Sequence, residues 1–234
     1  MNIVAIIASP RGMKGNTGRL LEEVLSGARE AGAETEILSL STLKVQPCVG
    51  CDLCHKTGTC SIGDDYEGIK EKLLACDGFI LASPNYIFSV TAQMKALFDR
   101  CCGLIHCMAL EGKYAAVVET SGGGEDAEVI SYMERVVNTL GATSVGGIGS
   151  PIAGIRAFPD EAHLYDQART LGRELCRCIR EKRRFPEQEP FLGAFRERMS
   201  GLVEFMEECW VFERDYWRDR NDSGIGHVRS AVQR

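Results

Sequence analysis

The sequence predicts an α/β fold in which helices cover both faces of a five-stranded parallel sheet. Short apolar runs alternate with longer amphipathic stretches along residues 1–185, and this alternation is typical of doubly wound sheets with right-handed crossovers. The first run, NIVAIIA at residues 2–8, is a continuous apolar segment of the kind expected for a strand buried on both faces. With 234 residues, 44% of them hydrophobic, the chain can bury a core of this kind.

Each apolar run is followed by a turn and then by a stretch with helical periodicity. After the first run, GNTGRLLEEVLSGAREAG carries apolar side chains at helical spacing and ends at Gly32. The unit then repeats, and its fifth strand has the weakest signal. We expect strands at residues 2–8, 34–40, 77–83, 113–120 and 142–150. We expect helices at residues 15–32, 66–76, 90–102, 125–141 and 160–184.

Five strands favour the flavodoxin-like order 2-1-3-4-5 over the six-stranded dinucleotide-binding order. The pattern changes after Pro186, so we divide the chain into a domain at residues 1–185 and a C-terminal helical extension at residues 186–234. Within the extension, residues 189–220 are predicted as one amphipathic helical stretch, and residues 221–234 as a loose tail. We expect the aromatic side chains of that stretch to pack on the domain or on a second subunit.

Composition limits the kinds of partner that this protein is expected to bind and the cell compartment in which it is expected to occur. The net charge of −6 argues against nucleic acid, because phosphate binding needs a basic surface. No run of eighteen apolar residues occurs and the N-terminus lacks the basic region of a signal peptide, so we expect no membrane partner and a cytoplasmic location. Most of the eleven cysteines are therefore expected to be reduced thiols.

Three loops should meet at the carboxyl ends of the strands, where open parallel sheets bind ligands. The first, SPRGMKGNTG at residues 9–18, precedes a helix N-terminus and suits a phosphate, because backbone N–H groups and the side chains of Ser9, Asn16 and Thr17 can donate to it. The second, SPNYIFS at residues 83–89, offers aromatic side chains that can flank a planar ring. The third, TSGGGED at residues 120–126, lets its backbone approach a ligand closely. Together they predict a site for one phosphate and one flat ring.

The segments ASPRGMKGNT, LASPNYIFSVTAQMKALFDR and ETSGGGE resemble, in order and spacing, the motifs of the flavodoxin-like NAD(P)H-dependent FMN reductase superfamily over about residues 1–180. The resemblance implies an FMN-dependent oxidoreductase. It implies that the FMN phosphate is held by Ser9, Arg11, Asn16 and Thr17. It implies that the ribityl chain and the isoalloxazine ring are contacted by Pro84, Asn85, Tyr86, Ile87, Phe88, Ser121 and Gly122.

A cysteine-rich loop, PCVGCDLCHKTGTC at residues 47–60, follows the second predicted strand. Structural zinc sites draw two ligands from each of two separated knuckles, and a dithiol redox site leaves two of these four thiols unexplained. The C-x2-C-x2-C spacing instead resembles the loop of bacterial ferredoxins that wraps a cubane cluster. His55 is interpreted as a polar neighbour, and Cys76, Cys101, Cys102, Cys107, Cys176 and Cys178 as packing residues.

The C-x2-C-x2-C-x5-C pattern in this position resembles the compact motif of the iron-sulfur flavoproteins. That resemblance implies a 4Fe-4S cluster whose ligands are Cys48, Cys51, Cys54 and Cys60. It also implies a homodimer or homotetramer in which the cluster and the flavin approach each other, across a subunit boundary in one arrangement. The loop is expected to emerge at the same sheet edge as the three flavin loops.

The leading hypothesis is an electron-transfer protein that connects a ferredoxin-like donor with a small acceptor such as oxygen, peroxide or a quinone. The first alternative is an NAD(P)H-dependent FMN or quinone reductase without a cluster, in which NAD(P)H is the electron donor. The second alternative is a redox-sensing flavin- or metal-binding regulatory module. We assign no catalytic acid or base, because the cofactors supply the chemistry in the leading hypothesis.

Overall fold

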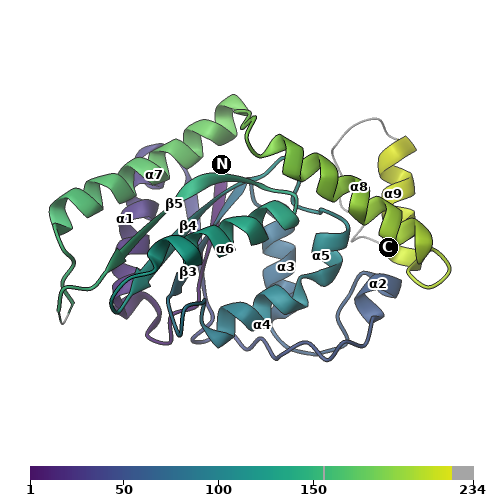
Figure 1. The fold of residues 1–234 in the computed structure, drawn as a ribbon, viewed down its shortest axis with the longest axis horizontal. Helices are drawn as coiled ribbons and strands as arrows, with labels where there is room; N and C mark the ends of the chain where they lie inside the picture. The colour runs from purple at the N-terminus through teal and green to yellow at the C-terminus, as the bar shows by residue number, and fades with distance from the viewer. Residues whose placement is uncertain (155, 223–234) are drawn as a thin grey trace.

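Residues 1–154 and 156–222 are described by the computed structural model, and their strands form one parallel sheet (Figure 1). The strands are β1 (Asn2–Ile7), β2 (Glu34–Ser39), β3 (Gly78–Pro84), β4 (Tyr114–Ser121) and β5 (Thr143–Pro151). They are hydrogen-bonded in the order β2-β1-β3-β4-β5, and every pairing is parallel. The predicted flavodoxin-like order is confirmed.

Helices cover both faces of the sheet, as predicted. One face carries α1 (Asn16–Glu30) and α7 (Glu161–Glu181). The other face carries α3 (Tyr66–Ala75), α4 (Ala92–Arg100), the short α5 (Cys102–His106) and α6 (Asp126–Thr139). Two short elements lie in the connecting loops, the 3-10 helix η1 (Gly12–Lys14) and α2 (Leu53–Thr57).

Alternate side chains of β1 supply the two halves of the core, which explains why its sequence is apolar without a period of two. Ile3 and Ile7 pack against α1 and α7, whereas Val4 and Ile6 pack against the helices of the opposite face. Helices α1 and α7 approach so closely at their glycines that a Cβ on Gly172 would lie 1.9 Å from the carbonyl oxygen of Val24.

The C-terminal extension contains two helices, α8 (Glu189–Phe205) and α9 (Val211–Asp222), so the prediction of one helical stretch is wrong. The chain turns between them, and this turn brings Trp210 onto the side chains of α2 and α5. Trp217 and Val203 form a small apolar core with Ile105 of α5, so this part of the aromatic stripe packs on the chain itself. Residues 223–234, most of the predicted loose tail, lie outside the described residues.

Figure 1 shows where the three predicted flavin loops and helix α2 of the cysteine loop lie. The carboxyl ends of β1, β3 and β4 point toward the lower left, where the three predicted flavin loops follow them. The dark-blue α2 lies at the right beside the yellow α9. Among the helices of residues 1–154 and 156–222, none has the length and apolar character needed to cross a bilayer.

Candidate functional site

The loop between β1 and α1 forms a cradle at the start of a helix. Gly15 takes the N-cap position of α1, and among the described residues no side chain caps that helix, so its first-turn N–H groups have no side-chain acceptor. A Cβ on Gly15 would lie 3.0 Å from Ser9 Oγ and 3.2 Å from Arg11 Cβ. This arrangement fits a phosphate group, which would accept hydrogen bonds from the N–H groups and benefit from the helix dipole.

The predicted phosphate residues surround this cradle. Ser9 and Thr17 are buried, Asn16 is half-buried and Arg11 is exposed. Ser9 Oγ accepts a hydrogen bond from the backbone N–H of Arg11 at 3.3 Å. The hydroxyls of Thr17 and Thr120 lie 2.6 Å apart, which ties the start of α1 to the end of β4.

The segment after β3 is a tight turn with an apolar tip. The backbone N–H of Tyr86 donates to the carbonyl of Ser89 at 2.8 Å, and Ile87 and Phe88 between them adopt left-handed φ angles of 51° and 62°. A β-branched residue in that region is unusual and costs of order 1 kcal/mol or more. Ile87 is nevertheless 90% exposed and Phe88 71% exposed. Strain at an exposed apolar tip points to a binding surface.

The third loop is tied to the second. The amide Nδ2 of Asn85 donates to the carbonyl of Gly124 at 3.3 Å, and the backbone N–H of Asn85 donates to the carbonyl of Thr120 at 2.9 Å. Gly124 has a φ of 129°, which only glycine adopts readily, and its N–H donates to Ser121 Oγ at 3.0 Å. Gly122 is exposed beside this turn. The structure thus brings the three loops together at one edge of the sheet.

Glu119 is a buried carboxyl group near this edge that the sequence analysis did not single out. It is fully buried in β4, immediately before Thr120 of the third loop. A Cβ on Gly149 would lie 2.9 Å from its Oε2, so the neighbouring strand closes over it. Burial and the nearby carboxylate of Asp126 raise the pKa of Glu119 to about 9. Glu119 therefore carries its proton at neutral pH.

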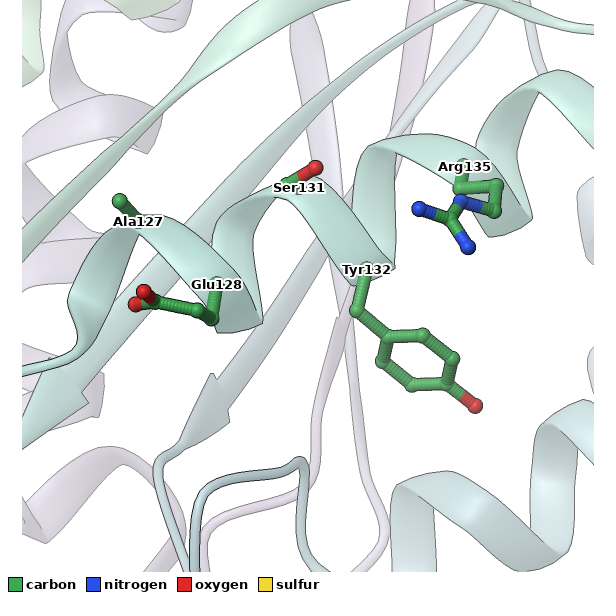
Figure 2. A pocket seen from close by; sticks show the side chains of 5 residues that line it. All are labelled: Ala127, Glu128, Ser131, Tyr132 and Arg135. Atoms are coloured by element: carbon green, nitrogen blue, oxygen red, sulfur yellow. The ribbon is translucent and has the colours of Figure 1, made fainter.

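A surface depression on α6 lies apart from these loops. Figure 2 shows its lining side chains, all of which belong to α6: Ala127, Glu128, Ser131, Tyr132 and Arg135. Because a single helix supplies all five, the depression has no convergent groups from other elements. The depression therefore gives no reason to move the predicted flavin site away from the three loops.

The cysteine loop follows β2 along the chain, as predicted, and its helix α2 packs against α5 and α9 (Figure 1). The reason is His55, which is buried and hydrogen-bonded to Glu213 of α9. A second contact comes from Phe212, whose ring would lie 2.4 Å from a Cβ on Gly58. The middle of the loop is therefore held by the C-terminal extension.

Arg100, the last residue of α4, fastens both ends of the cysteine loop. Its buried guanidinium donates to the carbonyl of Gln46 at 3.0 Å and to the two carboxylate oxygens of Asp64 at 2.8 and 3.1 Å. The guanidinium also lies over the ring of Tyr66, 4.6 Å from its centroid. Asp64 is buried as well, and although burial opposes its charge, the hydrogen bond from Arg100 lowers its pKa.

The four loop cysteines are free thiols, Cys48 and Cys51 exposed and Cys54 and Cys60 half-buried. The N–H of Gly50 points at Cys48 Sγ at 3.5 Å, and a hydrogen bond with Ser61 lowers the pKa of Cys51. Such donors to sulfur suit thiolate ligands of iron. Within residues 1–154 and 156–222 the four loop sulfur atoms do not form a set that could hold a single metal ion, whereas a cubane would be held by one thiolate on each of its four irons.

A different set of ligand atoms is gathered behind the loop. One ring nitrogen each of His55 and His106 and the sulfur of Cys102 lie within 4.8 Å of one another, and we call these residues the triad. Glu213 is fully buried, and its two carboxylate oxygens lie 2.5 Å from His55 Nδ1 and 3.0 Å from His106 Nδ1. Trp210 stacks on His55 with ring centroids 4.5 Å apart.

Hydrogen bonds within this group shift the pKa values of its thiol and its imidazoles. Hydrogen bonds with His106 and His55 lower the pKa of the Cys102 thiol to about 6. Burial alone would lower the pKa of His106, but its hydrogen bonds with Cys102 and Glu213 raise it to about 9. His55 is predicted from the sequence as a polar neighbour and Cys102 as a packing residue, whereas no role is predicted for His106 or Glu213. The C-x3-H spacing of Cys102 and His106 was the one local signal.

A family model described as NADPH-dependent FMN reductase matches residues 1–154, which is about two thirds of the chain. The chain belongs to this family. An iron-sulfur flavoprotein of Archaeoglobus fulgidus is 30% identical to this FMN reductase family member over 223 residues, covering 94% of this chain and 99% of that protein. An iron-sulfur flavoprotein of Methanocaldococcus jannaschii is 34% identical over 191 residues, covering 77% of this chain and 98% of that protein.

Solved structures support the fold of this FMN reductase family member. A flavodoxin, WrbA-like protein from Agrobacterium tumefaciens aligns with a TM-score of 0.57 at 17% identity and covers 78% of this chain and 99% of its own. A structure described as a flavone reductase aligns with a TM-score of 0.60 at 18% identity and covers 77% of this chain and 63% of its own. At these identities the likeness concerns the fold alone.

Membership of the FMN reductase family, together with the iron-sulfur flavoprotein relatives, makes this chain an FMN-dependent redox protein and a flavin-dependent oxidoreductase. The predicted family and the predicted flavin-dependent oxidoreductase activity are confirmed. The assignment of FMN contacts to single residues stays a prediction, as do the four cluster ligands.

Proposed function

We propose that this protein binds FMN at the three loops and a 4Fe-4S cluster through Cys48, Cys51, Cys54 and Cys60, and that it passes electrons between a ferredoxin-like donor and a small acceptor. One observation carries the proposal. The C-x2-C-x2-C-x5-C pattern occurs in a chain that aligns over 94% of its length with a protein named iron-sulfur flavoprotein.

The loop has the properties that cluster assembly needs. Its thiols are free, and two of them are exposed to incoming iron and sulfide. Gly50 and Asp52 adopt left-handed φ angles of 62° and 58°, so the backbone already winds tightly between the first three cysteines. Lys70 and Glu67 of α3 hold the segment from Gly58 to Cys60 through two backbone hydrogen bonds of 2.7 Å.

The chain's own residues would position FMN. Ser9, Asn16 and Thr17 would hold the phosphate at the start of α1, and the turn at Tyr86–Phe88 would cover the flat ring. When bound, FMN exchanges one electron or a two-electron hydride, and the cluster exchanges single electrons. A cluster that exchanges single electrons and a flavin that can exchange two would connect a one-electron protein donor with a two-electron acceptor such as oxygen, peroxide or a quinone.

The two cofactor sites face different parts of the chain, and this supports a homodimer or homotetramer. The flavin loops follow β1, β3 and β4, whereas α2 of the cysteine loop packs on α5 and α9. A second copy that places its flavin loops against this cysteine loop would shorten the electron path. We therefore propose transfer across a subunit boundary.

The test is analysis of iron, sulfide and FMN in one anaerobically purified sample. We expect one FMN and about four iron and four sulfide per chain. Cys48→Ser should lower the iron content and leave FMN bound, whereas Cys209→Ser, which removes an exposed thiol outside the loop, should leave both unchanged. FMN without iron, even after reconstitution with iron and sulfide, would refute the cluster.

A second candidate function is direct reduction of FMN by NAD(P)H, favoured by the description of the matching family as NADPH-dependent. Anaerobic mixing with NADPH separates the two. Rapid bleaching of the flavin absorption, unchanged in Cys48→Ser, would support the reductase. Bleaching by reduced ferredoxin but not by NADPH, and its loss in Cys48→Ser, would support electron transfer through the cluster.

A further inference from the structure

The buried group behind the cysteine loop has the ligand types of a second metal site, which lies beside Cys54 of the loop. Its residues come from three separate elements: His55 from α2, Cys102 and His106 from α5, and Glu213 from α9. Cys102 and His106 are four residues apart on one helix, so their side chains project from the same face. That spacing is used by paired metal ligands on helices.

Glu213 decides which ring nitrogens are available. Its carboxylate accepts an N–H from Nδ1 of His55 and from Nδ1 of His106, so each ring presents Nε2 as its second nitrogen. Nε2 of His106 faces Cys102 Sγ at 3.5 Å. Metal-bound histidines commonly donate their other ring N–H to a carboxylate in this way, which fixes both the tautomer and the ring orientation.

One of the three separations between the ligand atoms matches a small bound ion. Zinc bonds of about 2.0 Å to nitrogen and about 2.3 Å to sulfur in a tetrahedral arrangement place nitrogen and sulfur about 3.5 Å apart. The observed separation of 3.5 Å between His106 Nε2 and Cys102 Sγ agrees with that value. The three ligand atoms lie within 4.8 Å of one another, so a pair at that limit would draw together by about 1 Å when an ion binds. Two imidazoles and one thiolate are a ligand set that zinc accepts well.

We propose that His55, Cys102 and His106 bind one zinc ion, with Glu213 as the residue that positions both imidazoles. Trp210 packs against both histidine rings. Cys102 and His106 are partly exposed, so an ion can reach them from solvent. Three protein ligands leave the fourth tetrahedral position to solvent. The ion would join α2, α5 and α9, and would thereby fix the cysteine loop and the C-terminal extension on the domain. This proposal does not rest on the 4Fe-4S cluster.

The test must remove the loop thiols, because they would also take up metal. The full-length chain carrying Cys48→Ser, Cys51→Ser, Cys54→Ser and Cys60→Ser serves as the background, and it is titrated anaerobically with cobalt(II) chloride. We expect about one cobalt per chain, with the intense visible bands of a tetrahedral site and a sulfur-to-cobalt charge-transfer band. Added zinc should displace the cobalt and raise the unfolding temperature.

Single changes in this background assign the ligands. Cys102→Ser should abolish the charge-transfer band, and Glu213→Gln should keep the band but weaken cobalt binding about 10- to 100-fold. Cys209→Ser and His163→Ala remove an exposed thiol and an exposed imidazole, and they should change nothing. FMN content and circular dichroism check that each variant folds.

Two results would overturn the proposal. One is a background protein that takes up no cobalt, which would leave His55, Cys102, His106 and Glu213 as a buried charge network. The other is a charge-transfer band that survives Cys102→Ser. If that variant fails to fold, X-ray absorption at the zinc edge of the background protein decides the matter, since one sulfur and two nitrogen neighbours are expected and a shell of nitrogen and oxygen alone would contradict the site.

Discussion

Glu119 shows how one side chain near the flavin loops makes the stability of this protein depend on pH. The folded chain holds its proton up to a pKa of about 9, whereas an exposed glutamate loses its proton near the ordinary pKa of 4.5. Between these values the folded state binds a proton that the unfolded state releases. Rising pH therefore favours unfolding throughout this window.

Glu119→Gln should remove this dependence, because glutamine resembles the protonated acid in shape and stays neutral. Between about pH 4.5 and pH 7 the free energy of unfolding of the wild type should fall relative to that of the variant by on the order of 3 kcal/mol. Urea denaturation at a series of pH values measures the difference. Glu128→Gln, an exposed carboxylate on α6, is the control, and a wild-type-minus-variant difference that stays flat with pH would contradict the assignment.

At the scale of elements, Arg100 and Asp64 determine the position of the cysteine loop. Both side chains are buried, and Arg100 binds a carbonyl before the loop and a carboxylate after it. Removing one partner of a buried pair leaves the other charge without compensation and costs about 3–5 kcal/mol. The length of chain between these two anchors contains all four cysteines.

Arg100→Met should accordingly destabilise the protein by about 3–5 kcal/mol and loosen the loop. Two measurements check this: urea denaturation, and the rate of tryptic cleavage after Lys56, which is exposed in α2 and should become more susceptible. Arg177→Met breaks an exposed pair with Glu174 and should change stability by less than about 1 kcal/mol. Equal effects of the two substitutions would show that Arg100 does not anchor the loop.

The elements that the sequence predicts well are those with a local cause. Strands β1, β3 and β4 are apolar runs, and the long helices of residues 1–185 have a periodic apolar face, so the order and bounds of these elements agree with the structure to within a few residues. Helix α2 has no such pattern: it is five residues long and is held by contacts between His55 and Glu213, 158 positions apart. The break between α8 and α9 likewise has no local signal, because residues 206–210 contain no glycine or proline.

The same distinction applies to the sites. Residues of the flavin loops stand next to strand ends, so topology alone brings Ser9, Tyr86 and Ser121 to one edge. The triad depends on where three helices pack, and the sequence holds only the Cys102–His106 spacing as a sign of it. When packing between distant segments sets the positions of side chains, a single sequence contains no periodic pattern from which those positions can be predicted.

At the scale of the whole molecule, the proposed homodimer or homotetramer would bury apolar side chains that are exposed in the single chain. Ile87 at the tip of the flavin turn is 90% exposed, Val49 in the cysteine loop is 67% exposed, and Phe205 at the end of α8 is 84% exposed. Transfer across a subunit boundary requires the first two to lie in the interface, because it places the flavin turn of one copy against the cysteine loop of the other. It makes no use of Phe205.

Light scattering should therefore give a mass of two or four times 25.7 kDa for the wild type. Ile87→Asp and Val49→Asp should each lower that mass toward the monomer, because a carboxylate would be buried against an apolar surface, and Phe205→Asp should not. In Val49→Asp, which leaves the flavin loops intact, FMN and iron should stay bound while reduction of the flavin by the cluster slows. A monomeric wild type, or a Val49→Asp protein that dissociates without slowing this transfer, would place both cofactors on one electron path within a single chain.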